Sequence, residues 1–439
     1  MARKIKPRIY KGTRDFLPEQ MVKRQYVIRI IRNVFEKFGF EPLETPSIEL
    51  WQTLSGKYGE EADRLTYRFT DRGKREVGLR YDLTVPLSRV IAMYPELPKP
   101  FKRYQIQPVW RADKPQKGRF REFYQCDADI IAGPSMLADT EILAVIYESL
   151  QQLGFRQFQM RINHRKVLGG ITEISGAGLE NELTICRAID KMDKIGTEGV
   201  SAELAANGIG KNSIHKIMEI LDIQGSNSER LDRMSDLLQH SETGRKGIAD
   251  LRALFGFLEL YGIPDKFILF DLHLSRGLDY YTGPIFETIV QEPKIGSITG
   301  GGRYDNLIGL FSGQQHPAVG TTIGLERIIT VMDELNMFPP HLRTPVRVLV
   351  TVFGPESLPY SIRIAQTLRA ERINCDLYCG KAKLRGQIGF ANDKGIPLVI
   401  IAGPDEAEKE SLTLKNMETG QQQTIPLKSV IRKVLDNLD

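Results

Sequence analysis

The sequence of 439 residues is poor in the residues that build metal centres and disulfide frameworks. It has four cysteines and six histidines, and both kinds are scattered along the chain. Cys375 and Cys379 lie four residues apart, but no further cysteine or histidine pair follows at the spacing of a zinc site. The scattered cysteines also form no disulfide pattern. We therefore expect no metal centre with histidine or cysteine ligands.

Long apolar runs and phosphate-binding glycine loops are missing as well. The longest apolar runs, such as residues 398–402, have strand length and fall far short of the roughly 20 residues that cross a bilayer. The basic start MARKIKPRIYKG is followed by no apolar signal region. Neither GxGxxG nor GxxxxGK[ST] occurs, which argues against a doubly wound nucleotide-binding sheet. The sequence thus predicts a cytoplasmic protein without a membrane partner.

The composition is that of a folded protein with several domains. Hydrophobic residues make up 41% and charged residues 26% of a chain that is too long for one ordinary core. The net charge of +5 is unevenly placed, because residues 102–121 hold seven basic side chains and one acidic one. Such a stretch suits a polyanion, although a solvated basic loop would look the same.

Apolar spacing divides the first part of the chain into a helix and several strands. Residues 22–38 have the spacing of an amphipathic helix. Residues 43–48, which follow Pro42 and include Pro46, are predicted to form an extended segment of edge or interface character. Strands are predicted at residues 67–71, 77–80, 100–109 and 121–130. The last two are joined by a loop without an intervening helix, which predicts an antiparallel hairpin.

Further along the chain the pattern changes twice. Residues 171–258 lose strand signals and carry apolar residues at helical spacing, after which strands return near residues 267–274 and 285–290. We expect one sheet interrupted by a helical module, with helices at residues 304–310 and 324–335. Beyond the proline-marked residues 339–345, strands and helices alternate, which predicts a small α/β domain with a mostly parallel sheet.

Polar residues follow or line several of the predicted strands. Arg111 comes directly after a strand, where a guanidinium can hold a phosphate with two parallel hydrogen bonds. In the returning strand, period-two alternation places Phe123, Gln125, Asp127 and Asp129 on one face. That face offers acceptors to a cationic ligand or to one that carries N–H groups.

Three more stretches combine glycines with arginines. AVGTTIGLERII, residues 318–329, places glycines before a helix that begins near Arg327, and GGGRYDNL, residues 300–307, places three glycines before a predicted helix whose backbone N–H groups could face an anion. SRGLDYYTG, residues 275–283, adds Arg276 and two tyrosines after an apolar run, where a solvated hairpin end is the alternative. Each of these motifs alone is ambiguous.

Together these motifs resemble those of a known family. Arg111 with its returning strand, and GLER before a helix, resemble the second and third signature motifs of class II aminoacyl-tRNA synthetases. Within that class the chain resembles the histidyl-tRNA synthetases through GTRDFLP, LRYDLTVPL, KPQKGRFREFYQCDADI, RGLDYYTG, GGGRYDNL and GLER. These motifs run from residue 12 to residue 327, and the predicted helical insertion and C-terminal domain also match that family's layout.

The resemblance implies a fold class and a division into domains. The fold would be an α+β catalytic domain on an antiparallel sheet, with a helical insertion and a C-terminal α/β anticodon-binding domain. The expected bounds are 1–165 for the first part of the catalytic domain, 166–258 for the insertion, 259–338 for its second part, 339–345 for a linker and 346–439 for the anticodon-binding domain.

The resemblance also implies how ATP is held. Arg111 would hold the α-phosphate of ATP and the carboxylate of histidine, and Arg276 would stabilise the α-phosphate as that carboxylate attacks it. Arg327 would stack on adenine and contact the γ-phosphate. Mg²⁺ would accompany ATP, held by phosphates and by a carboxylate such as Glu122. The expected catalytic residues are Arg111 and Arg276, and the expected ATP-binding residues are Arg111, Glu122 and Arg327.

The histidine pocket implied by the resemblance draws on polar and aromatic residues. Asp82, Thr84 and Gln125 would bind the α-amino group, and Asp129 and Tyr281 would enclose the imidazole. The complete expected set is Asp82, Leu83, Thr84, Arg111, Gln125, Asp129, Arg276, Tyr280 and Tyr281.

Two places depart from the family pattern. Many bacterial members carry Glu-Gly-Thr where this chain has Asp-Leu-Thr at residues 82–84, and Glu where it has Asp129. A shorter carboxylate changes the reach and keeps the charge. Trp110 stands where a smaller residue is more usual, and the sequence offers no account of it.

The activity implied is that of a histidine–tRNA ligase. It would activate L-histidine with ATP to histidyl-adenylate and pyrophosphate, and then transfer histidine to the 3′ end of tRNA(His). Family members are homodimers, and residues 39–49 match the first class II motif, which builds that interface. The alternative is a non-catalytic, histidine-sensing regulatory paralogue of the same fold. Such paralogues generally lose the motif arginines or the C-terminal domain, and this chain keeps both.

Overall fold

The computed structural model describes residues 5–57, 60–115, 118–275, 280–340 and 342–438. The chain forms two compact units. The first comprises residues up to Arg14 together with Val27–Asn336, and the second comprises Asp15–Tyr26 with the residues from Met337 onward. No helix in the described ranges is long and apolar enough to cross a membrane. The domain bounds expected from the sequence stay predictions.

An eight-stranded sheet forms the centre of the first unit, in the order β1-β5-β6-β11-β10-β9-β7-β8. Its inner neighbours all pair antiparallel, and only the two edge pairs, β1 with β5 and β7 with β8, are parallel. This confirms the antiparallel catalytic sheet and the β5–β6 hairpin expected from the sequence. The strands are β1 (Glu41–Pro42), β5 (Phe101–Trp110), β6 (Glu122–Ile131), β7 (Phe158–His164), β8 (Ile268–Phe270), β9 (Pro284–Val290), β10 (Thr299–Arg303) and β11 (Ala318–Gly324).

The expectation of a single sheet in this unit is wrong. Three short strands form a separate sheet in the order β2-β4-β3, with β4 paired antiparallel to both neighbours. Because each has only three or four residues, its apolar pattern is too short to reveal which sheet it joins. The strands are β2 (Ile48–Leu50), β3 (Arg68–Thr70) and β4 (Glu76–Leu79), and the helices near them are α2 (Trp51–Leu54), α3 (Glu60–Leu65), α4 (Thr84–Met93) and α12 (Gly309–Ser312).

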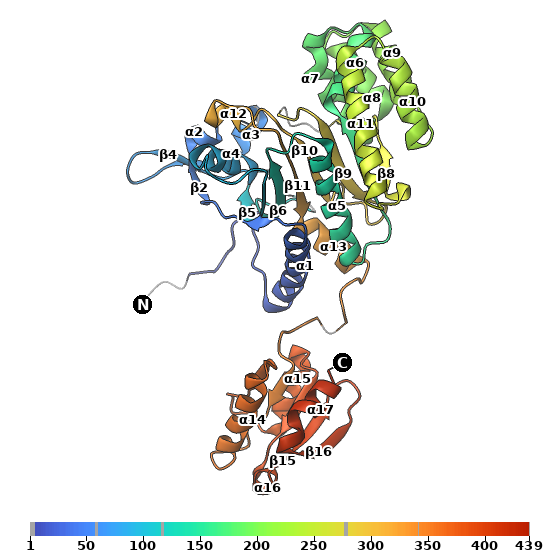
Figure 1. The fold of residues 1–439 in the computed structure, drawn as a ribbon. Helices are drawn as coiled ribbons and strands as arrows, with labels where there is room; N and C mark the ends of the chain where they lie inside the picture. The colour runs from blue at the N-terminus through green and yellow to red at the C-terminus, as the bar shows by residue number, and fades with distance from the viewer. Residues whose placement is uncertain (1–4, 58–59, 116–117, 276–279, 341, 439) are drawn as a thin grey trace. The chain divides into compact units, whose positions relative to one another are not determined.

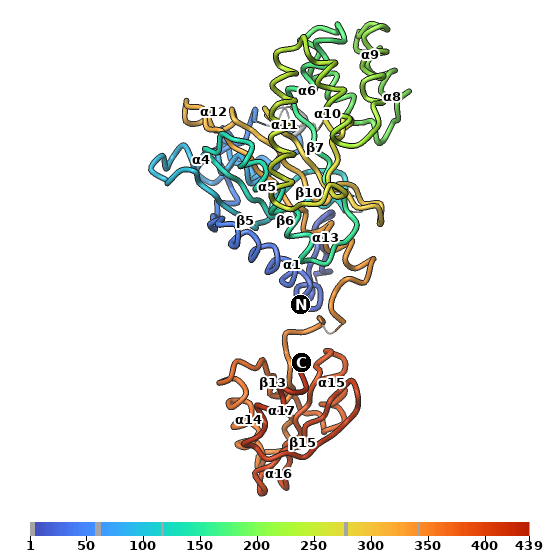
Figure 2. The backbone as a smooth tube through the Cα atoms, turned by 45° about the vertical axis from the view of Figure 1, so that its right-hand side comes forward, coloured from blue at the N-terminus to red at the C-terminus, as the bar shows by residue number. Residues whose placement is uncertain are grey.

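The helical module lies between β7 and β8, as its apolar spacing predicts. In α9 the side chains of Ile214, Ile217 and Leu221 are buried on one face. Helix α11 contacts α6, α10 and α5, so the module packs on the helix that follows β6 (Figure 1 and Figure 2). Its helices are α6 (Arg165–Ser175), α7 (Glu182–Ile189), α8 (Met192–Ala206), α9 (Lys211–Leu221), α10 (Asn227–Leu237) and α11 (Glu242–Leu260), and the other long helices are α1 (Pro18–Lys37), α5 (Met136–Gln152) and α13 (Leu325–Glu334).

The glycine run at residues 300–302 lies in the buried strand β10, so the expectation that it opens a helix is wrong. The residues around Gly301 and Gly302 leave no room for a side chain at either position. A Cβ on Gly301 would lie 2.0 Å from the carbonyl oxygen of Gly320 and 2.7 Å from the Phe286 ring. A Cβ on Gly302 would lie 2.8 Å from the Tyr281 ring. Close packing, and not anion binding at a helix end, explains these glycines.

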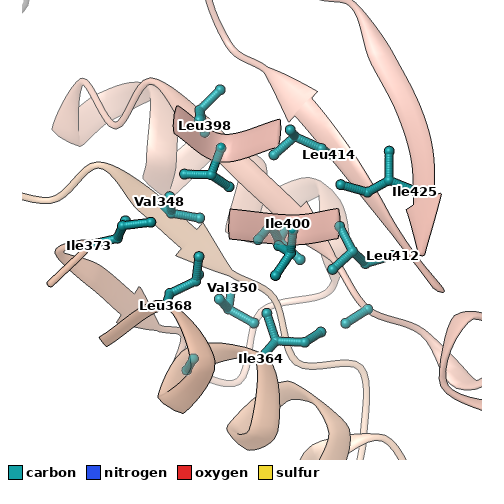
Figure 3. Close-up of a cluster of buried hydrophobic side chains, with 14 of the residues drawn as sticks. Val348, Val350, Ile364, Leu368, Ile373, Leu398, Ile400, Leu412, Leu414 and Ile425 are labelled. Atoms are coloured by element: carbon teal, nitrogen blue, oxygen red, sulfur yellow. The ribbon is translucent and has the colours of Figure 1, made fainter. Parts of the chain in front are cut away.

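The second unit is the α/β domain predicted for the C-terminus. Its five-stranded sheet has the order β13-β12-β14-β15-β16, with parallel pairing around β12 and antiparallel pairing from β14 onward. Strands β12 and β14 are apolar at every position, because apolar clusters cover both of their faces. Figure 3 shows the cluster on one face, which includes Val348, Val350, Leu398 and Ile400. The elements are β12 (Val348–Val350), α14 (Leu358–Ala370), β13 (Cys375–Leu377), α15 (Leu384–Lys394), β14 (Leu398–Ile401), α16 (Pro404–Glu408), β15 (Ser411–Asn416), β16 (Gln422–Pro426) and α17 (Val430–Asp436).

The tight packing of β10 gives a stability prediction. We expect Gly301→Ala to destabilise the first unit by roughly 3 kcal/mol, because a new methyl group forces β10 and β11 apart. Thermal unfolding of the variant and the parent chain measures this. Gly256→Ala is the matched control. It adds a methyl group inside α11 where nothing lies within 4 Å, so it should leave stability unchanged or raise it by about 0.5–1 kcal/mol. Equal midpoints for both variants would contradict the packing explanation.

Candidate active site

A cavity of about 1400 Å³ opens over the central strands of the large sheet. It brings together residues that are up to 263 positions apart in the chain, from Arg64 to Arg327. Leu83 and Glu122 do not line it, and Arg276 lies outside the described residues. The predicted site residues that do line it are Asp82, Thr84, Arg111, Gln125, Asp129, Tyr280, Tyr281 and Arg327.

Glycines on β11 leave the space that the cavity needs. In the antiparallel register, Gly320 lies opposite Asp129 and Gly324 lies opposite Gln125. A Cβ on Gly320 would lie 1.9 Å from Oδ1 of Asp129. A side chain at this position would therefore displace the carboxylate. Gly320, in the strand that precedes GLER, thus serves the site by its small size.

Two arginines lie at the end of the sheet where β5 and β11 end and β6 begins. Arg111 directly follows β5, donates from Nε to the carbonyl oxygen of Tyr81 at 3.1 Å, and places its guanidinium 4.2 Å from the Tyr81 ring centre and 5.2 Å from that of Phe123. Arg327 lies in the first turn of α13 and donates to the carbonyl oxygen of Ser297. Aromatic rings and a backbone acceptor hold the Arg111 guanidinium beside the cavity, and a backbone acceptor holds that of Arg327.

Asp82 lies at the start of α4 and has a structural partner. Its Oδ1 accepts hydrogen bonds from the backbone N–H groups of Thr84 and Val85, both at 3.1 Å. These donors have no partner inside the helix, so the carboxylate caps the helix start and is favoured there by the helix dipole. The Leu83 side chain is fully buried, and its carbonyl oxygen accepts from Arg103. The Asp-Leu-Thr motif therefore anchors a helix as well as lining the cavity.

Asp129 is held by two buried partners. Arg103, on the neighbouring strand β5, lies 2.8 Å from its carboxylate, and both side chains are buried. The Tyr304 hydroxyl donates to its other oxygen. Burial raises the pKa of Asp129, while Arg103 and the hydrogen bond from Tyr304 lower it. Burial also raises the pKa of Tyr304, and the negative charge of Asp129 adds to that rise, so the phenol keeps its proton.

Asp127 lies between Gln125 and Asp129 on the same face of β6 and also lines the cavity. Burial raises its pKa to about 7, with Arg103 opposing that shift and Asp129 adding to it. Thr322, opposite Asp127 on β11, accepts from Nε2 of Gln125 at 3.3 Å and lowers the pKa of Asp127 through a hydrogen bond. Asp127 is thus a buried carboxyl group that titrates near neutral pH.

Glu122 and Trp110 form a pair that explains one departure from the family pattern. The indole Nε1 of Trp110 donates to Oε2 of Glu122 at 2.8 Å, and the two residues lie opposite each other in the hairpin. Among the described residues no group of three or more His, Cys, Asp or Glu side chains is placed to hold a metal ion. The assignment of Glu122 to ATP or to Mg²⁺ stays a prediction. The glutamate that does line the cavity is Glu326, which accepts from the backbone N–H of Tyr124.

Several cavity residues were not assigned from the sequence. Tyr304 and Glu326 lie inside motifs that were recognised, and strand alternation places Asp127 on the polar face without giving it a role. Arg187 and Asp190 reach the cavity from α7 and the residue after it, in the helical module. No local pattern signals the last two, because only the tertiary fold brings the module to the cavity.

The cavity has two chemical ends. Guanidinium groups of Arg111 and Arg327 lie where β6 begins, and carboxyl groups of Asp127 and Asp129 lie about five to seven residues further along that strand. At about 3.4 Å per residue these two positions lie on the order of 17–24 Å from the start of the strand. An antiparallel sheet with one arginine directly after β5 and another in the helix that follows β11 is the active-site framework of class II aminoacyl-tRNA synthetases.

Comparisons with known proteins extend this assignment. Residues 12–328 match the family model described as Histidyl-tRNA synthetase, and residues 347–437 match the one described as Anticodon binding domain. A histidine–tRNA ligase from Gloeobacter violaceus is 42% identical over 95% of this chain and 96% of its own length. One from Aeropyrum pernix is 43% identical over 98% of both. The chain belongs to the histidyl-tRNA synthetase family.

Solved structures agree with the fold. The crystal structure of histidyl-tRNA synthetase from Nostoc sp. has a TM-score of 0.88 at 32% identity and covers 99% of this chain and all of its own. A structure from Bacillus halodurans, described as an ATP phosphoribosyltransferase regulatory subunit/histidyl-tRNA synthetase, has a TM-score of 0.77 at 21% identity over 90% of this chain and 99% of its own. That second likeness shows the fold alone.

The raised pKa of Asp127 predicts a pH-dependent stability cost. The folded chain keeps the Asp127 proton up to about pH 7, whereas the unfolded chain loses it near pH 4. Between these values the folded state binds more protons, so stability falls as pH rises and levels off above the folded pKa. Asp127→Asn removes this cost, and its stability advantage over the parent chain should grow by roughly 2 kcal/mol from pH 5 to pH 8. Thermal unfolding without ligand at both pH values measures this, and a constant difference would contradict the raised pKa.

Proposed function

We propose that the cavity carries out the histidine–tRNA ligase reaction. The chain activates L-histidine with ATP, giving histidyl-adenylate and pyrophosphate, and then transfers histidine to the 3′ end of tRNA(His). The observation that supports this most is the pairing of arginines at one end of the cavity with carboxyl groups at the other. ATP and the histidine carboxylate are anionic, and the remainder of histidine carries an ammonium group and an imidazole. One elongated cavity thus matches both substrates.

Adenylation requires positioning and charge stabilisation, and no protein nucleophile. The histidine carboxylate attacks the α-phosphorus in line, one oxygen–phosphorus bond forms, and pyrophosphate leaves with the electron pair of the broken bond. Arg111 orients the attacking carboxylate and the α-phosphate, and Arg276 neutralises the charge that develops on the α-phosphate. Arg327 stacks on adenine and contacts the γ-phosphate. The phosphates of ATP, and a carboxylate such as Glu122, would hold Mg²⁺, which would supply further neutralisation of the phosphate charge.

The histidine pocket lies further along β6. Asp129 and Tyr281 enclose the imidazole, with Tyr280 4.8 Å from the Tyr281 ring centre. Arg103 and Tyr304 hold Asp129 in one orientation, so the carboxylate presents a fixed acceptor to an imidazole N–H. A site built to pair hydrogen-bonding groups rejects analogues that lack them by up to roughly 10⁴–10⁵.

The tRNA is the third substrate. The second unit matches the anticodon-binding domain over residues 347–437 and binds the anticodon arm. The basic loop that follows Arg111 contacts the acceptor end, where Arg119 and Asp113 line the cavity. We place the protein in the cytoplasm, as the sequence predicts.

The chain acts as a homodimer, and an apolar row on the small sheet supports this. Leu50 and Phe69 lie on either side of Val77 in the register of β2, β4 and β3, so all three share one face. Leu50 is 44% and Phe69 42% exposed in the single chain. Val77 between them is 6% exposed, so the exposed apolar surface is that of Leu50 and Phe69. Neighbouring exposed apolar side chains can form part of an interaction surface. The row begins next to residues 39–49, which match the first class II motif.

The regulatory paralogue remains the alternative, and no observation favours it. Arg111 and Arg327 line the cavity, and the C-terminal domain is complete over the matched range. A protein that only senses histidine would use the carboxyl groups and Arg111, but it has no use for Arg327, which is assigned to ATP alone.

Pyrophosphate exchange tests the enzymatic reaction. We expect exchange between ATP and pyrophosphate with histidine alone among the amino acids. Arg276→Ala should lower the exchange rate by roughly 10²–10³-fold while histidine binding survives, because the guanidinium acts mainly on the transition state. Arg156→Ala is the control, since Arg156 is an exposed arginine of the same unit that bonds Gln151. A folded protein that binds histidine and exchanges with no amino acid would make the regulatory paralogue the better proposal.

Mass measurement tests the dimer. Phe69→Glu places a charge in the apolar row, so we expect a shift from dimer to monomer in size-exclusion chromatography with light scattering. Leu260→Glu is the matched control, because Leu260 is 82% exposed on α11 and should leave the mass unchanged. A monomeric parent chain, or a Phe69 variant that stays dimeric, would contradict the proposed interface.

A further inference from the structure

Asp127 is a cavity residue to which neither the family resemblance nor the reaction scheme above gives a role. It lies at the centre of a polar patch, two residues from Gln125 and two from Asp129, with Gln105 and Thr322 opposite it on the neighbouring strands. Its side chain is 3% exposed. Its Oδ1 has no hydrogen-bond partner within the part of the chain that the structure describes. A buried carboxylate oxygen without a partner is costly, so it marks a place where a ligand group is expected.

The other two carboxylates of this patch are already engaged. Asp82 accepts two backbone hydrogen bonds at the start of α4. Asp129 is paired with Arg103 at 2.8 Å and accepts from Tyr304. Of the three acidic residues, Asp127 therefore has the greatest capacity to bind a group of the substrate.

The charges around Asp127 favour a cation over a neutral donor. The charged groups that act on it include Arg103, which opposes its raised pKa, and Asp129 and Asp82, which reinforce it. Arg80 also interacts electrostatically with Asp127, and its guanidinium donates to Thr45, Gln107 and Pro108. Two guanidinium groups thus face three carboxyl groups. A positive group on the ligand would offset this excess of negative charge. The ammonium of an amino acid supplies one positive charge and three N–H donors.

We propose that Asp127 binds the α-ammonium group of histidine, with its unpartnered oxygen as the acceptor, and that it makes the site specific for an amino acid over its hydroxy analogue. This inference rests on the proposed function. Asp127 then lies between the imidazole, at Asp129, and the carboxylate, toward Arg111. On a strand, positions two residues apart are roughly 7 Å apart, which suits neighbouring groups of one small ligand. Asp82 mainly positions α4 and Thr84 beside the same group.

Two ligands separate this role from a structural one. L-histidine and imidazole-lactate, in which a hydroxyl replaces the ammonium, have the same imidazole and carboxylate. We expect Asp127→Asn to weaken histidine binding by roughly 10- to 100-fold in titration calorimetry, since a charge-assisted hydrogen bond is lost. Binding of imidazole-lactate should change by less than about threefold, because it places no cation there. The preference of the parent chain for histidine should thus largely disappear.

Asp113→Asn is the matched control. Asp113 also lines the cavity, so its substitution removes one negative charge from the same space and should leave the ratio of the two affinities as in the parent chain. The Asp127 variant is expected to be at least as stable as the parent at pH 8, so thermal unfolding in the same buffer shows whether lost binding reflects lost folding.

The outcomes are distinct. Unchanged histidine affinity in Asp127→Asn, or an equal loss for both ligands, would overturn the assignment to the ammonium group. A parent chain that binds no histidine would refute the proposed function itself. A parent chain that binds histidine with a collapsed preference in the variant would support the inference even if pyrophosphate exchange failed.

Discussion

The ion pair between Arg103 and Asp129 is the interaction on which the candidate site depends. It joins β5 to β6 with both side chains buried, where removing charges from water costs several kcal/mol for each ion. The pair is sustained because further polar groups surround it. Arg103 also donates to Gln105 and to the carbonyl oxygen of Leu83, and Asp129 accepts from Tyr304. The same contacts connect the sheet to the motif that begins α4.

This buried charge sets a spatial requirement that the glycines meet. The carboxylate of Asp129 occupies the space that a side chain on Gly320 would fill, and Tyr281 packs where one on Gly302 would lie. The glycines therefore lower the strand propensity of β10 and β11, but they leave the space that the Asp129 carboxylate and the Tyr281 ring occupy. At these positions a residue with a side chain would favour the strand, but glycine is required by the geometry of the site.

The sequence predicted well what local patterns control. The β5–β6 hairpin follows from two apolar stretches joined by a loop with proline and glycine, and the second unit follows from apolar strands alternating with helices. Recognised motifs located Arg111 and Arg327 at the cavity. Prediction from the sequence failed where the strands that pair are distant from each other in the chain. The sequence of a strand of three or four residues does not show which sheet the strand joins. Glycine has no side chain and so adds nothing to the alternation of apolar and polar residues that identifies a strand, which is why residues 300–302 were predicted to precede a helix.

Side-chain contacts across strands were the other limit. Trp110 has no rationale until its indole meets Glu122 across the hairpin. Arg187 and Asp190 belong to a helical module whose own sequence gives no sign of a cavity. Strand alternation did place Asp127 on the polar face of β6, but the burial that raises its pKa depends on strands far away in the chain.

The arrangement along β6 connects stability to substrate recognition. Groups that attract a cation lie side by side there, and without ligand their mutual repulsion and burial destabilise the fold. In the proposed reaction a positive ligand group would relieve that cost, so part of the binding free energy would come from the electrostatic cost of the buried carboxyl groups. The arginines near the start of β6 carry the opposite charge and would favour phosphates and a carboxylate. A ligand that is cationic at one end and anionic at the other would then bind in one direction, with its carboxylate toward the phosphate that it is proposed to attack.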